Sequence, residues 1–139
     1  MNAMSVESAV HIYHRTLDPN SQDSLAKLAR LIPPGSWVLD LGAGPGILGR
    51  YLAEHRACTV DGVEYHPVAV AEAASGYRRL ECADLEQITL ADHFAGCRYD
   101  YILCADILEH LRRPEALLAQ LPELLASGGQ VLLSVPNAA

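Results

Sequence analysis

The sequence predicts an α/β fold in which helices cover both faces of a parallel β-sheet. Short apolar runs alternate with stretches of helical periodicity, and Tyr99–Cys104 is apolar on both faces, as in a buried parallel strand. Parallel strands joined by helices need right-handed crossovers, which give a doubly wound sheet. Because ligands bind such sheets at the carboxyl ends of the strands, acidic residues at those ends become candidate binding residues.

The composition predicts a single soluble domain over residues 1–139. Half of the residues are hydrophobic, which suffices for a core, but no apolar run approaches the length of a membrane span. No secretory leader is visible, so we expect a cytoplasmic protein. The formal charge is −7 and Lys27 is the only lysine, which argues against a nucleic-acid partner.

The order of the elements follows from apolar periodicity and from the prolines and glycines between them. Residues 1–20 form a lead-in, with a short helix expected over 6–15 and a turn at 17–21. Helical periodicity then extends over about residues 22–32, where two prolines stop it. In the first half, a strand is expected over 37–41, a helix from a glycine turn to about 55, a strand over 59–64 and a helix over 67–74. In the second half, a strand is expected over 78–82, a loop with or without a turn of helix over 85–98, and a strand over 99–104. A helix over 114–126, interrupted or restarted at 122, a turn at 127–129 and a strand over 130–135 complete the expected order.

The segment Asp40–Gly46 reads Asp-x-Gly-x-Gly-x-Gly and joins a predicted strand to a predicted helix. Such a turn needs residues with positive φ and lets the backbone approach a ligand closely. The dinucleotide fingerprint G-x-G-x-x-G is not matched, because Ile47 stands where its third glycine belongs. We expect Asp40 to accept backbone N–H groups of the turn, to reach the ammonium group of a ligand, or to do both.

Two further acids end predicted strands. Glu64 follows the glycine turn by about 20 residues, where a carboxylate accepts hydrogen bonds from both hydroxyls of an adenosine ribose; the alternative is a surface carboxylate that caps the strand. Asp84 is placed to accept from the adenine amine, with the N–H of Leu85 facing a ring nitrogen, or else it caps the next turn. Tyr65 either packs on the ribose or adenine or is a half-buried aromatic residue.

Histidine and cysteine show no pattern of a metal site or of a nucleophile. The six histidines form no ligand set, and the four cysteines lack C-x-x-C spacing, which predicts free thiols that are buried or partly buried. No residue stands in a G-x-S-x-G turn, so the nucleophile signature of a hydrolase is missing. His110 lies near the predicted cleft, where it is either a general base or a locally packed side chain.

Taken together, these segments resemble the successive motifs of class I S-adenosylmethionine-dependent methyltransferases. The similarity includes the turn at Asp40–Gly46 and the stretch Tyr99–Leu111 around the fourth strand. It also includes the stretch Leu125–Asn137 around the fifth strand, where Ser127 replaces the proline that is usual in the family. Residues 17–21 resemble the lead-in of bacterial methyltransferase domains.

The resemblance implies S-adenosylmethionine as the cofactor, S-adenosylhomocysteine as the product, and a small-molecule, sugar or lipid acceptor. It places the glycine turn and Asp106 at the methionine part, Glu64 on the ribose and Asp84 on the adenine. His110 is the candidate catalytic base, and no metal ion is implied. The implied cofactor-binding residues are Asp40, Gly42, Ala43, Gly44, Gly46, Glu64, Tyr65, Asp84, Leu85 and Asp106.

The resemblance also implies a Rossmann-like sheet with the strand order 3-2-1-4-5. The family sheet has two more strands, and because the motifs here end with the fifth, we expect those two to be missing. Residues 131–135 would then form an exposed apolar edge, through which we expect a homodimer to form. Two other functions stay open, namely a nicotinamide-dependent oxidoreductase domain, which shares the ribose-binding acid, and a non-catalytic cofactor-binding module.

Overall fold

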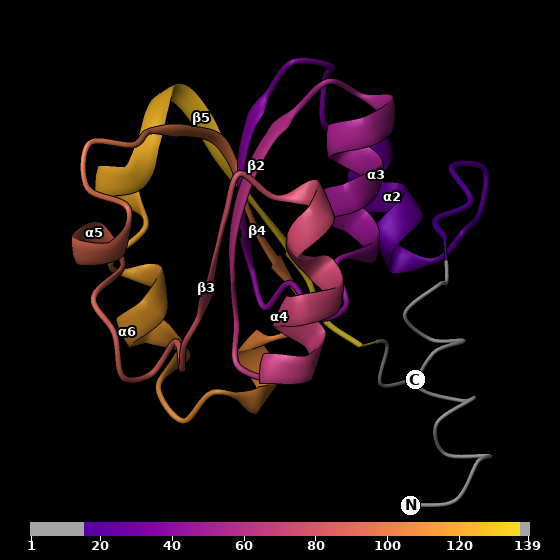
Figure 1. Cartoon of the computed structure of the whole chain (residues 1–139). Coiled ribbons are helices and arrows are strands. Elements are labelled where there is room, and N and C mark those ends of the chain that lie inside the picture. Colours follow the sequence, from indigo (N-terminus) through magenta and orange to yellow (C-terminus); the bar gives the residue numbers. More distant parts are fainter. Residues whose placement is uncertain (1–15, 137–139) are drawn as a thin grey trace, which may run out of the picture.

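The computed structural model of the chain describes residues 16–136, and its core is a sheet of five parallel strands (Figure 1). The strand order is β3-β2-β1-β4-β5, and every neighbouring pair is parallel, which confirms the predicted doubly wound arrangement. The strands are β1 (Trp37–Leu41), β2 (Thr59–Glu64), β3 (Arg79–Cys82), β4 (Tyr99–Ala105) and β5 (Leu125–Ser134). The bounds of β1 and β2 are those that the apolar pattern predicts.

Helices cover both faces of the sheet, with α2, α3 and α4 on one face and α5 and α6 on the other (Figure 1). None of the helices within residues 16–136 combines the length and the hydropathy of a membrane span. The α-helices are α2 (Ser24–Leu31), α3 (Ile47–His55), α4 (Pro67–Ala73), α5 (Leu90–His93) and α6 (Pro114–Leu118), and the 3-10 segments are η1 (Ala74–Gly76), η2 (Leu108–His110) and η3 (Pro122–Leu124).

The lead-in is described only in part. The turn predicted at 17–21 is present, because Asp18 accepts hydrogen bonds from the N–H of Asn20 at its side chain and from the N–H of Ser21 at its carbonyl. Asp23 then caps α2 by accepting from the N–H of Ala26 at 2.9 Å. The helix expected over 6–15 lies outside the described residues.

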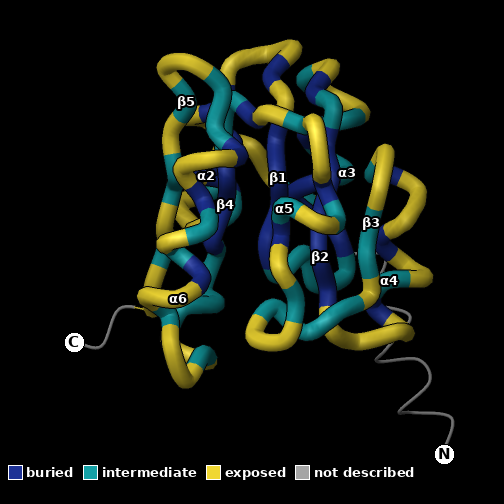
Figure 2. Tube along the Cα trace, turned by 90° about the vertical axis from the view of Figure 1, so that its left-hand side faces the viewer, coloured by how far each residue is buried: buried dark blue, intermediate teal, exposed yellow. Residues whose placement is uncertain are grey.

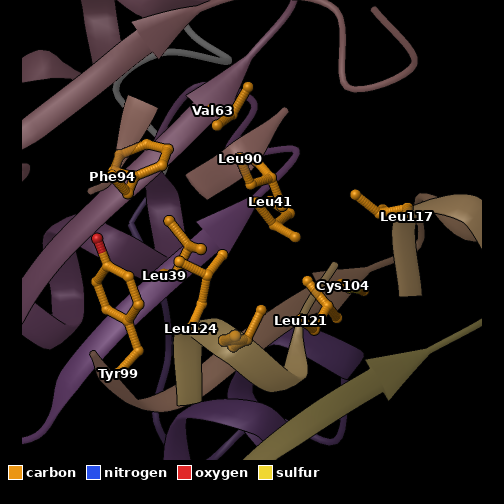
Figure 3. Packing of buried hydrophobic residues seen from close by; sticks show 11 residues of the cluster. Leu39, Leu41, Val63, Leu90, Phe94, Tyr99, Cys104, Leu117, Leu121 and Leu124 are labelled. Atoms are coloured by element: carbon orange, nitrogen blue, oxygen red, sulfur yellow. The ribbon is translucent and has the colours of Figure 1, made fainter. Parts of the chain in front are cut away.

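Alternation along β1 divides its side chains between two apolar cores. Val38 packs with residues of α2 and α3, whereas Leu39 and Leu41 pack on the opposite face with Phe94 and other residues that follow α5 and α6 (Figure 3). Strands β1, β2 and β4 are buried along most of their length, and the edge strands β3 and β5 are more exposed (Figure 2). Asp40 alternates with the two leucines, so its carboxylate lies on the face covered by α2 and α3.

The segment before β5 confirms the restart predicted at 122 but corrects the extent of the helix predicted over 114–126. The α-helix α6 ends at Leu118, and η3 begins at Pro122. Proline has no N–H to continue an α-helical hydrogen-bond series, so the apolar periodicity of this stretch continues into a 3-10 turn instead. The chain becomes extended at Leu125, before the position where the sequence pattern predicts the strand.

The predicted turn at 127–129 lies inside β5 rather than before it. Tyr99 pairs with Leu125 and Tyr101 pairs with Gln130, so the register shifts across the intervening residues. Gly128 has φ +76°, which lets the backbone bulge without ending the strand. The glycines therefore interrupt the pairing with β4 locally while the strand continues to Ser134.

Candidate functional site

The candidate site consists of two neighbouring pockets at the carboxyl ends of β1, β2, β3 and β4. Their volumes are about 340 Å³ and 170 Å³, and Gly42 lines both. The larger pocket is lined by Gly42, Val63, Glu64, Tyr65, His66, Ala83, Asp84, Leu85, Glu86, Ile107, His110 and Leu111. The smaller pocket is lined by Leu25, Asp40, Gly42, Ala43, Gly44, Pro45, Ile47, Leu48 and Ala105. All predicted cofactor-binding residues except Gly46 and Asp106 line one of the two pockets.

The glycine turn between β1 and α3 has the backbone conformation that the sequence predicts. Gly42, Gly44 and Gly46 have φ angles of 82°, 58° and 83°. A Cβ atom at Gly42 would overlap the side chain of Ile107, and one at Gly46 would lie 2.6 Å from the Cβ of Ala73. At Gly44 no atom lies within 4 Å of that position, so the backbone is open on the side of the smaller pocket that it lines.

The N–H groups of the turn are already bound to protein oxygens. Those of Gly42 and Ala43 donate to the carbonyl of Val63 at 2.9 Å and 3.0 Å, and that of Gly46 donates to the carbonyl of Ala43. The N–H of Gly44 donates to Glu64 at 2.8 Å, and Pro45 has no N–H. The N–H groups of residues 42–46 are therefore not free to bind a phosphate.

Glu64 connects the end of β2 to the glycine turn. Its Oε1 accepts from the N–H of Gly44 at 2.8 Å and its Oε2 from the N–H of His66 at 2.9 Å. The residue is 8% exposed and lines the larger pocket, which excludes the alternative of a surface carboxylate. A carboxylate has about four acceptor positions, so two protein N–H donors leave capacity for ligand hydroxyls.

Asp40 has a tyrosine rather than the turn as its hydrogen-bond donor within residues 16–136. The O–H of Tyr77 donates to its Oδ2 at 2.6 Å. Asp40 is 3% exposed, and burial raises its pKa to about 6, an effect that the hydrogen bond from Tyr77 opposes and the charge of Glu64 reinforces. Asp40 lines the smaller pocket, so its expected role toward a ligand stays a prediction.

The sequence pattern did not single out Tyr77, which follows η1. Its ring lies against three glycines: a Cβ atom at Gly62 would lie 2.8 Å from the ring, one at Gly46 3.2 Å from it, and one at Gly49 would overlap it. Gly49 lies inside α3 and Gly62 inside β2, where glycine is unfavourable. Glycines within both elements are the signal that a bulky side chain from elsewhere packs between them.

Asp84 and Tyr65 both line the larger pocket; the structure is compatible with both expected roles of Asp84, whereas the exposure of Tyr65 contradicts the alternative of a half-buried aromatic residue. Asp84 accepts from the N–H of Glu86 at 2.9 Å, so it caps the next turn, yet it also lines the pocket beside Leu85. Tyr65 is 62% exposed at the pocket and stacks edge-on against His66, with ring centroids 5.3 Å apart. The two residues therefore have the freedom to contact a ligand, and their assignment stays a prediction.

Asp106 is hydrogen-bonded to the last residue of β5. Its N–H donates to the carbonyl of Ser134 at 3.0 Å, and the hydroxyl of Ser134 donates to its Oδ1 at 3.0 Å. Its φ angle is 54°, an uncommon conformation for a residue other than glycine. The pockets are lined by its neighbours Ala105 and Ile107. The bonds to Ser134 thus hold the turn after β4 in place around the site.

His110 lies in η2 and lines the larger pocket. Its side chain is 76% exposed, and its Nε2 lies 3.4 Å from Oε1 of Glu109. An exposed imidazole beside a carboxylate at a pocket mouth is able to accept a proton from an incoming group. Its role as a base stays a prediction.

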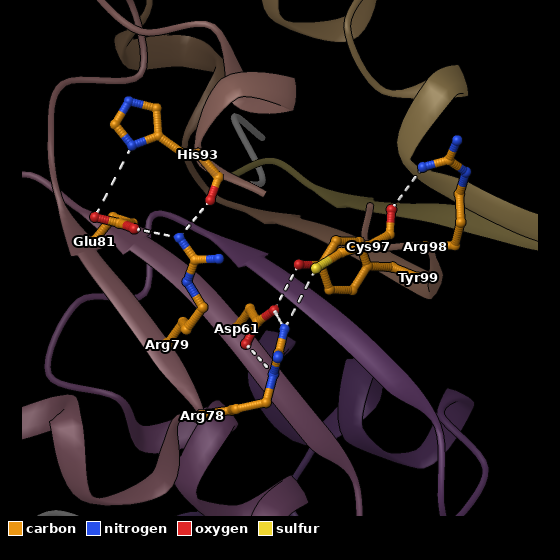
Figure 4. Close-up of polar contacts among 8 residues, drawn as sticks. All are labelled: Asp61, Arg78, Arg79, Glu81, His93, Cys97, Arg98 and Tyr99. Atoms are coloured by element: carbon orange, nitrogen blue, oxygen red, sulfur yellow. Dashed lines mark hydrogen bonds and ion pairs between the residues drawn. The ribbon is translucent and has the colours of Figure 1, made fainter. Parts of the chain in front are cut away.

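A second polar cluster lies at the opposite, amino ends of the strands (Figure 4). Asp61 of β2 is fully buried. Its carboxylate accepts hydrogen bonds from Nε of Arg78 at 3.0 Å and from the hydroxyl of Tyr99 at 2.6 Å. Burial and the carboxylate hold the pKa of Tyr99 far above its usual value, so the phenol stays a donor. The cluster joins β2 to the starts of β3 and β4, and it contacts neither pocket of the site.

The cysteines are free, as predicted, but they are not all buried. Cys58 and Cys104 are buried, Cys97 is half-buried and Cys82 is exposed, which corrects the expectation for Cys82. β3 is an edge strand, so a side chain at its end reaches solvent. Burial and the nearby charge of Asp40 raise the pKa of Cys104 to about 12, which makes this thiol unreactive at neutral pH.

Comparison with known families gives one match over most of the chain. The family model of a methyltransferase domain matches residues 12–139. The ubiquinone biosynthesis O-methyltransferase of Citrobacter koseri is 33% identical over 107 residues, which cover 74% of this chain and 43% of that protein. The enzyme of the same name from Pseudomonas aeruginosa is 35% identical over 111 residues, which cover 74% of this chain and 45% of that protein. The chain therefore spans less than half the length of these relatives.

Among solved structures, a TehB-like SAM-dependent methyltransferase from Corynebacterium glutamicum superposes with a TM-score of 0.69. The alignment covers 95% of this chain and 73% of that one, at 21% sequence identity. At this level of identity the likeness bears on the fold. It agrees with the parallel five-stranded sheet described above.

Proposed function

Since the chain belongs to the class I S-adenosylmethionine-dependent methyltransferases, we propose that its two pockets bind S-adenosylmethionine and that the protein transfers the methyl group to a small-molecule acceptor. The observation that carries this proposal is the position of Glu64. The residue is 8% exposed, its carboxylate accepts from the glycine turn, and it lines the larger pocket.

The larger pocket accommodates the adenosine part. Glu64 accepts from the ribose hydroxyls, in charge-assisted hydrogen bonds that are stronger than neutral ones. Asp84 accepts from the adenine amine while the N–H of Leu85 faces a ring nitrogen. Tyr65, which is 62% exposed at the pocket, is free to move against the ribose or the base.

A nicotinamide dinucleotide fits the turn poorly. Its pyrophosphate would need backbone N–H donors, and those of Gly42, Ala43, Gly44 and Gly46 all donate to protein oxygens. A carboxylate, Asp40, also lies beneath the turn and lines the smaller pocket, where it would repel a phosphate. A cationic ligand group suits this place better.

The smaller pocket accommodates the methionine part, which contacts the backbone of Ala43 and Gly44. Gly46 lets the turn pack against α4. Asp106 fixes the loop after β4. When bound, S-adenosylmethionine supplies an activated methyl group on a sulfonium. The protein's contribution is alignment and electrostatics: Glu64 fixes the ribose and Asp40 provides the negative charge near the cationic end. Ile107 and Leu111 give the larger pocket apolar walls that limit water.

The acceptor is proposed to be a small molecule with a hydroxyl group. Two relatives are named as O-methyltransferases of ubiquinone biosynthesis, and a hydroxyl needs a base before it attacks a methyl group. His110 lines the larger pocket with an exposed imidazole and is the base in this proposal. The variant His110→Asn should retain cofactor binding and lose transfer, whereas His55→Asn, on α3 outside both pockets, should retain both.

We also propose that the protein forms a homodimer through β5. This strand is at the edge of the sheet, and Leu133 and Val135 are 49% and 62% exposed. Residues 124–139 contain no charged side chain, in a chain whose formal charge is −7. A second copy can therefore approach this edge with less like-charge repulsion than elsewhere, and edge pairing would cover the unpaired backbone groups.

Titration calorimetry of the purified chain with S-adenosylmethionine, S-adenosylhomocysteine and NAD tests the cofactor assignment. We expect binding of the first two and none of NAD. Binding of NAD without the other two would overturn the proposal, and so would the absence of binding of all three to a chain whose folding is shown by a cooperative thermal transition.

A further inference from the structure

The contact between Tyr77 and Asp40 joins the cofactor site to a side chain that does not line it. Tyr77 comes from the segment after η1, and Asp40 ends β1 beneath the glycine turn. Their oxygens are 2.6 Å apart. Tyr77 lines neither pocket, whereas Asp40 lines the smaller one. An effect of the Tyr77 hydroxyl on the ligand therefore passes through its hydrogen bond to Asp40.

Close packing of the Tyr77 ring holds its hydroxyl in this position. The ring lies between Gly46, Gly49 and Gly62, and a Cβ atom at any of the three would crowd or overlap it. Burial and the charge of Asp40 raise the pKa of Tyr77 well above its usual value, so the hydroxyl stays protonated and acts as the donor. A ring fixed on this many sides delivers a hydrogen bond of constant direction.

Asp40 has no cationic partner among the described residues. No Lys, Arg or His within residues 16–136 forms an ion pair with it. Glu64 adds negative charge nearby, and Cys104 of β4 remains a neutral thiol. Arg50 of α3 donates to the carbonyls of Pro45 and Glu72, and its charge acts on Tyr77. The hydrogen bond from Tyr77 is thus the main protein contact that favours the ionised carboxylate.

We propose that Tyr77 is a positioning residue that keeps Asp40 ionised and directed at the smaller pocket, and that it thereby sets the affinity for the cationic amino-acid end of the cofactor. This inference rests on the proposed function, because it assigns the smaller pocket to the methionine part. It adds a residue from outside the glycine turn to the recognition of that part. It also predicts that binding depends on pH through Asp40.

The variant Tyr77→Phe tests the proposal, because it keeps the ring that packs between the three glycines and removes only the hydroxyl that donates to Asp40. We expect its affinity for S-adenosylmethionine to fall by about two- to tenfold at pH 7 and to approach the native value by about pH 9, as Asp40 ionises at higher pH. His66 and His110 also line the larger pocket, so the informative quantity is the difference between the pH profile of the variant and that of the native chain. Tyr51→Phe, on α3 and outside both pockets, should keep the native profile.

A truncated ligand separates a local effect from a general loss of structure. Methylthioadenosine keeps the adenosine and lacks the amino-acid end, so its affinity should be the same in the native chain and in Tyr77→Phe. Equal losses for both ligands, or a loss for S-adenosylmethionine that is independent of pH, would overturn the proposal.

A ligand-free measurement keeps this inference distinct from the cofactor assignment. Carbon-13 NMR of the Asp40 carboxyl in the unliganded chain should give a higher pKa in Tyr77→Phe than in the native chain, whichever ligand binds. An unchanged titration would overturn the role of Tyr77 even if S-adenosylmethionine binds. Failure of S-adenosylmethionine to bind the native chain, with the expected NMR shift present, would instead refute the cofactor assignment.

Discussion

The N–H of Gly44 donates to Oε1 of Glu64 at 2.8 Å, and this bond joins the glycine turn after β1 to the end of β2. The other oxygen of Glu64 accepts from the N–H of His66 at the start of α4. One carboxylate therefore joins two of the loops that line the larger pocket. A side chain in this position shapes the unliganded site, and we propose that it also contacts the ligand.

The glycines of the turn should differ in what they contribute. At Gly46 a Cβ atom would lie 2.6 Å from the Cβ of Ala73 at a φ of 83°, so Gly46→Ala should lower the free energy of unfolding by about 2–4 kcal/mol. At Gly44 the space is open, so Gly44→Ala should cost only about 1 kcal/mol. Urea unfolding measures both. Equal losses in the two variants would contradict this assignment.

Gly44→Ala should instead weaken binding. Its new methyl group would extend from the backbone beside the smaller pocket, at a place where the native chain is open. Calorimetry with S-adenosylmethionine should show at least a several-fold loss in a variant that is nearly as stable as the native chain.

Asp40 should make stability depend on pH. Burial raises its pKa to about 6 from 3.8, so between these values the folded state binds the proton more tightly than the unfolded state. Its contribution to stability therefore falls as the pH rises from about 4 to about 6 and is constant above that. Asp40→Asn removes this titration and should be more stable than the native chain at pH 7, by about 2–3 kcal/mol.

Unfolding of Asp40→Asn and of the native chain at several pH values measures this difference. It should widen from pH 4 to pH 6 and then stay constant. Asp92→Asn, an exposed carboxylate on α5, is the matched control and should give no such widening. A difference that is the same at all pH values would show that Asp40 keeps an ordinary pKa.

The polar cluster at the amino ends of the strands should serve stability and not binding. Tyr99→Phe removes the hydroxyl that donates to the fully buried Asp61 at 2.6 Å, which should cost about 1–3 kcal/mol. Tyr101→Phe, on the same strand but half-buried, should cost less. Neither change should alter the affinity for S-adenosylmethionine, because the cluster contacts neither pocket. A binding defect in Tyr99→Phe at full folding would contradict this separation.

The edge of β5 should determine the oligomeric state. Light scattering should show a dimer for the native chain and a monomer for Leu133→Lys, because this change places a charge in the segment 124–139, which has no charged side chain. Leu31→Lys changes an equally apolar side chain, 59% exposed on α2, and should leave the dimer intact. A native monomer at high concentration would contradict the proposed interface.

The central sheet could be predicted from the sequence because its signals are local. Trp37–Leu41 is a short apolar run that ends at a glycine turn, and Thr59–Glu64 is a short segment with β-branched residues that ends in an acid; the structure has strands with those bounds. The region from Pro114 to Leu125 was less predictable. Its leucines have helical spacing, but Pro122 limits the α-helix and the chain becomes extended by Leu125.

Site residues could be predicted where their position at the end of a strand brings them to the pocket. They could not be predicted where the site depends on a hydrogen bond between two residues that are distant in the sequence. Glu64 and Asp84 end neighbouring parallel strands, so topology alone brings them to one pocket. The partner of Asp40 is Tyr77, 37 residues away, and no local pattern relates the two. Only glycines inside α3 and β2 hint that a side chain packs there.

The central claim is that Glu64 binds the ribose of S-adenosylmethionine at the carboxyl end of β2, and the most direct test is the dissociation constant of Glu64→Ala. Loss of charge-assisted hydrogen bonds of about 1.5–3 kcal/mol should raise the Kd for both S-adenosylmethionine and S-adenosylhomocysteine by about ten- to hundredfold. Glu72→Ala, an exposed acid on α4 outside both pockets, should leave both constants unchanged. A folded Glu64→Ala chain with the native Kd would contradict the assignment of this pocket to the cofactor.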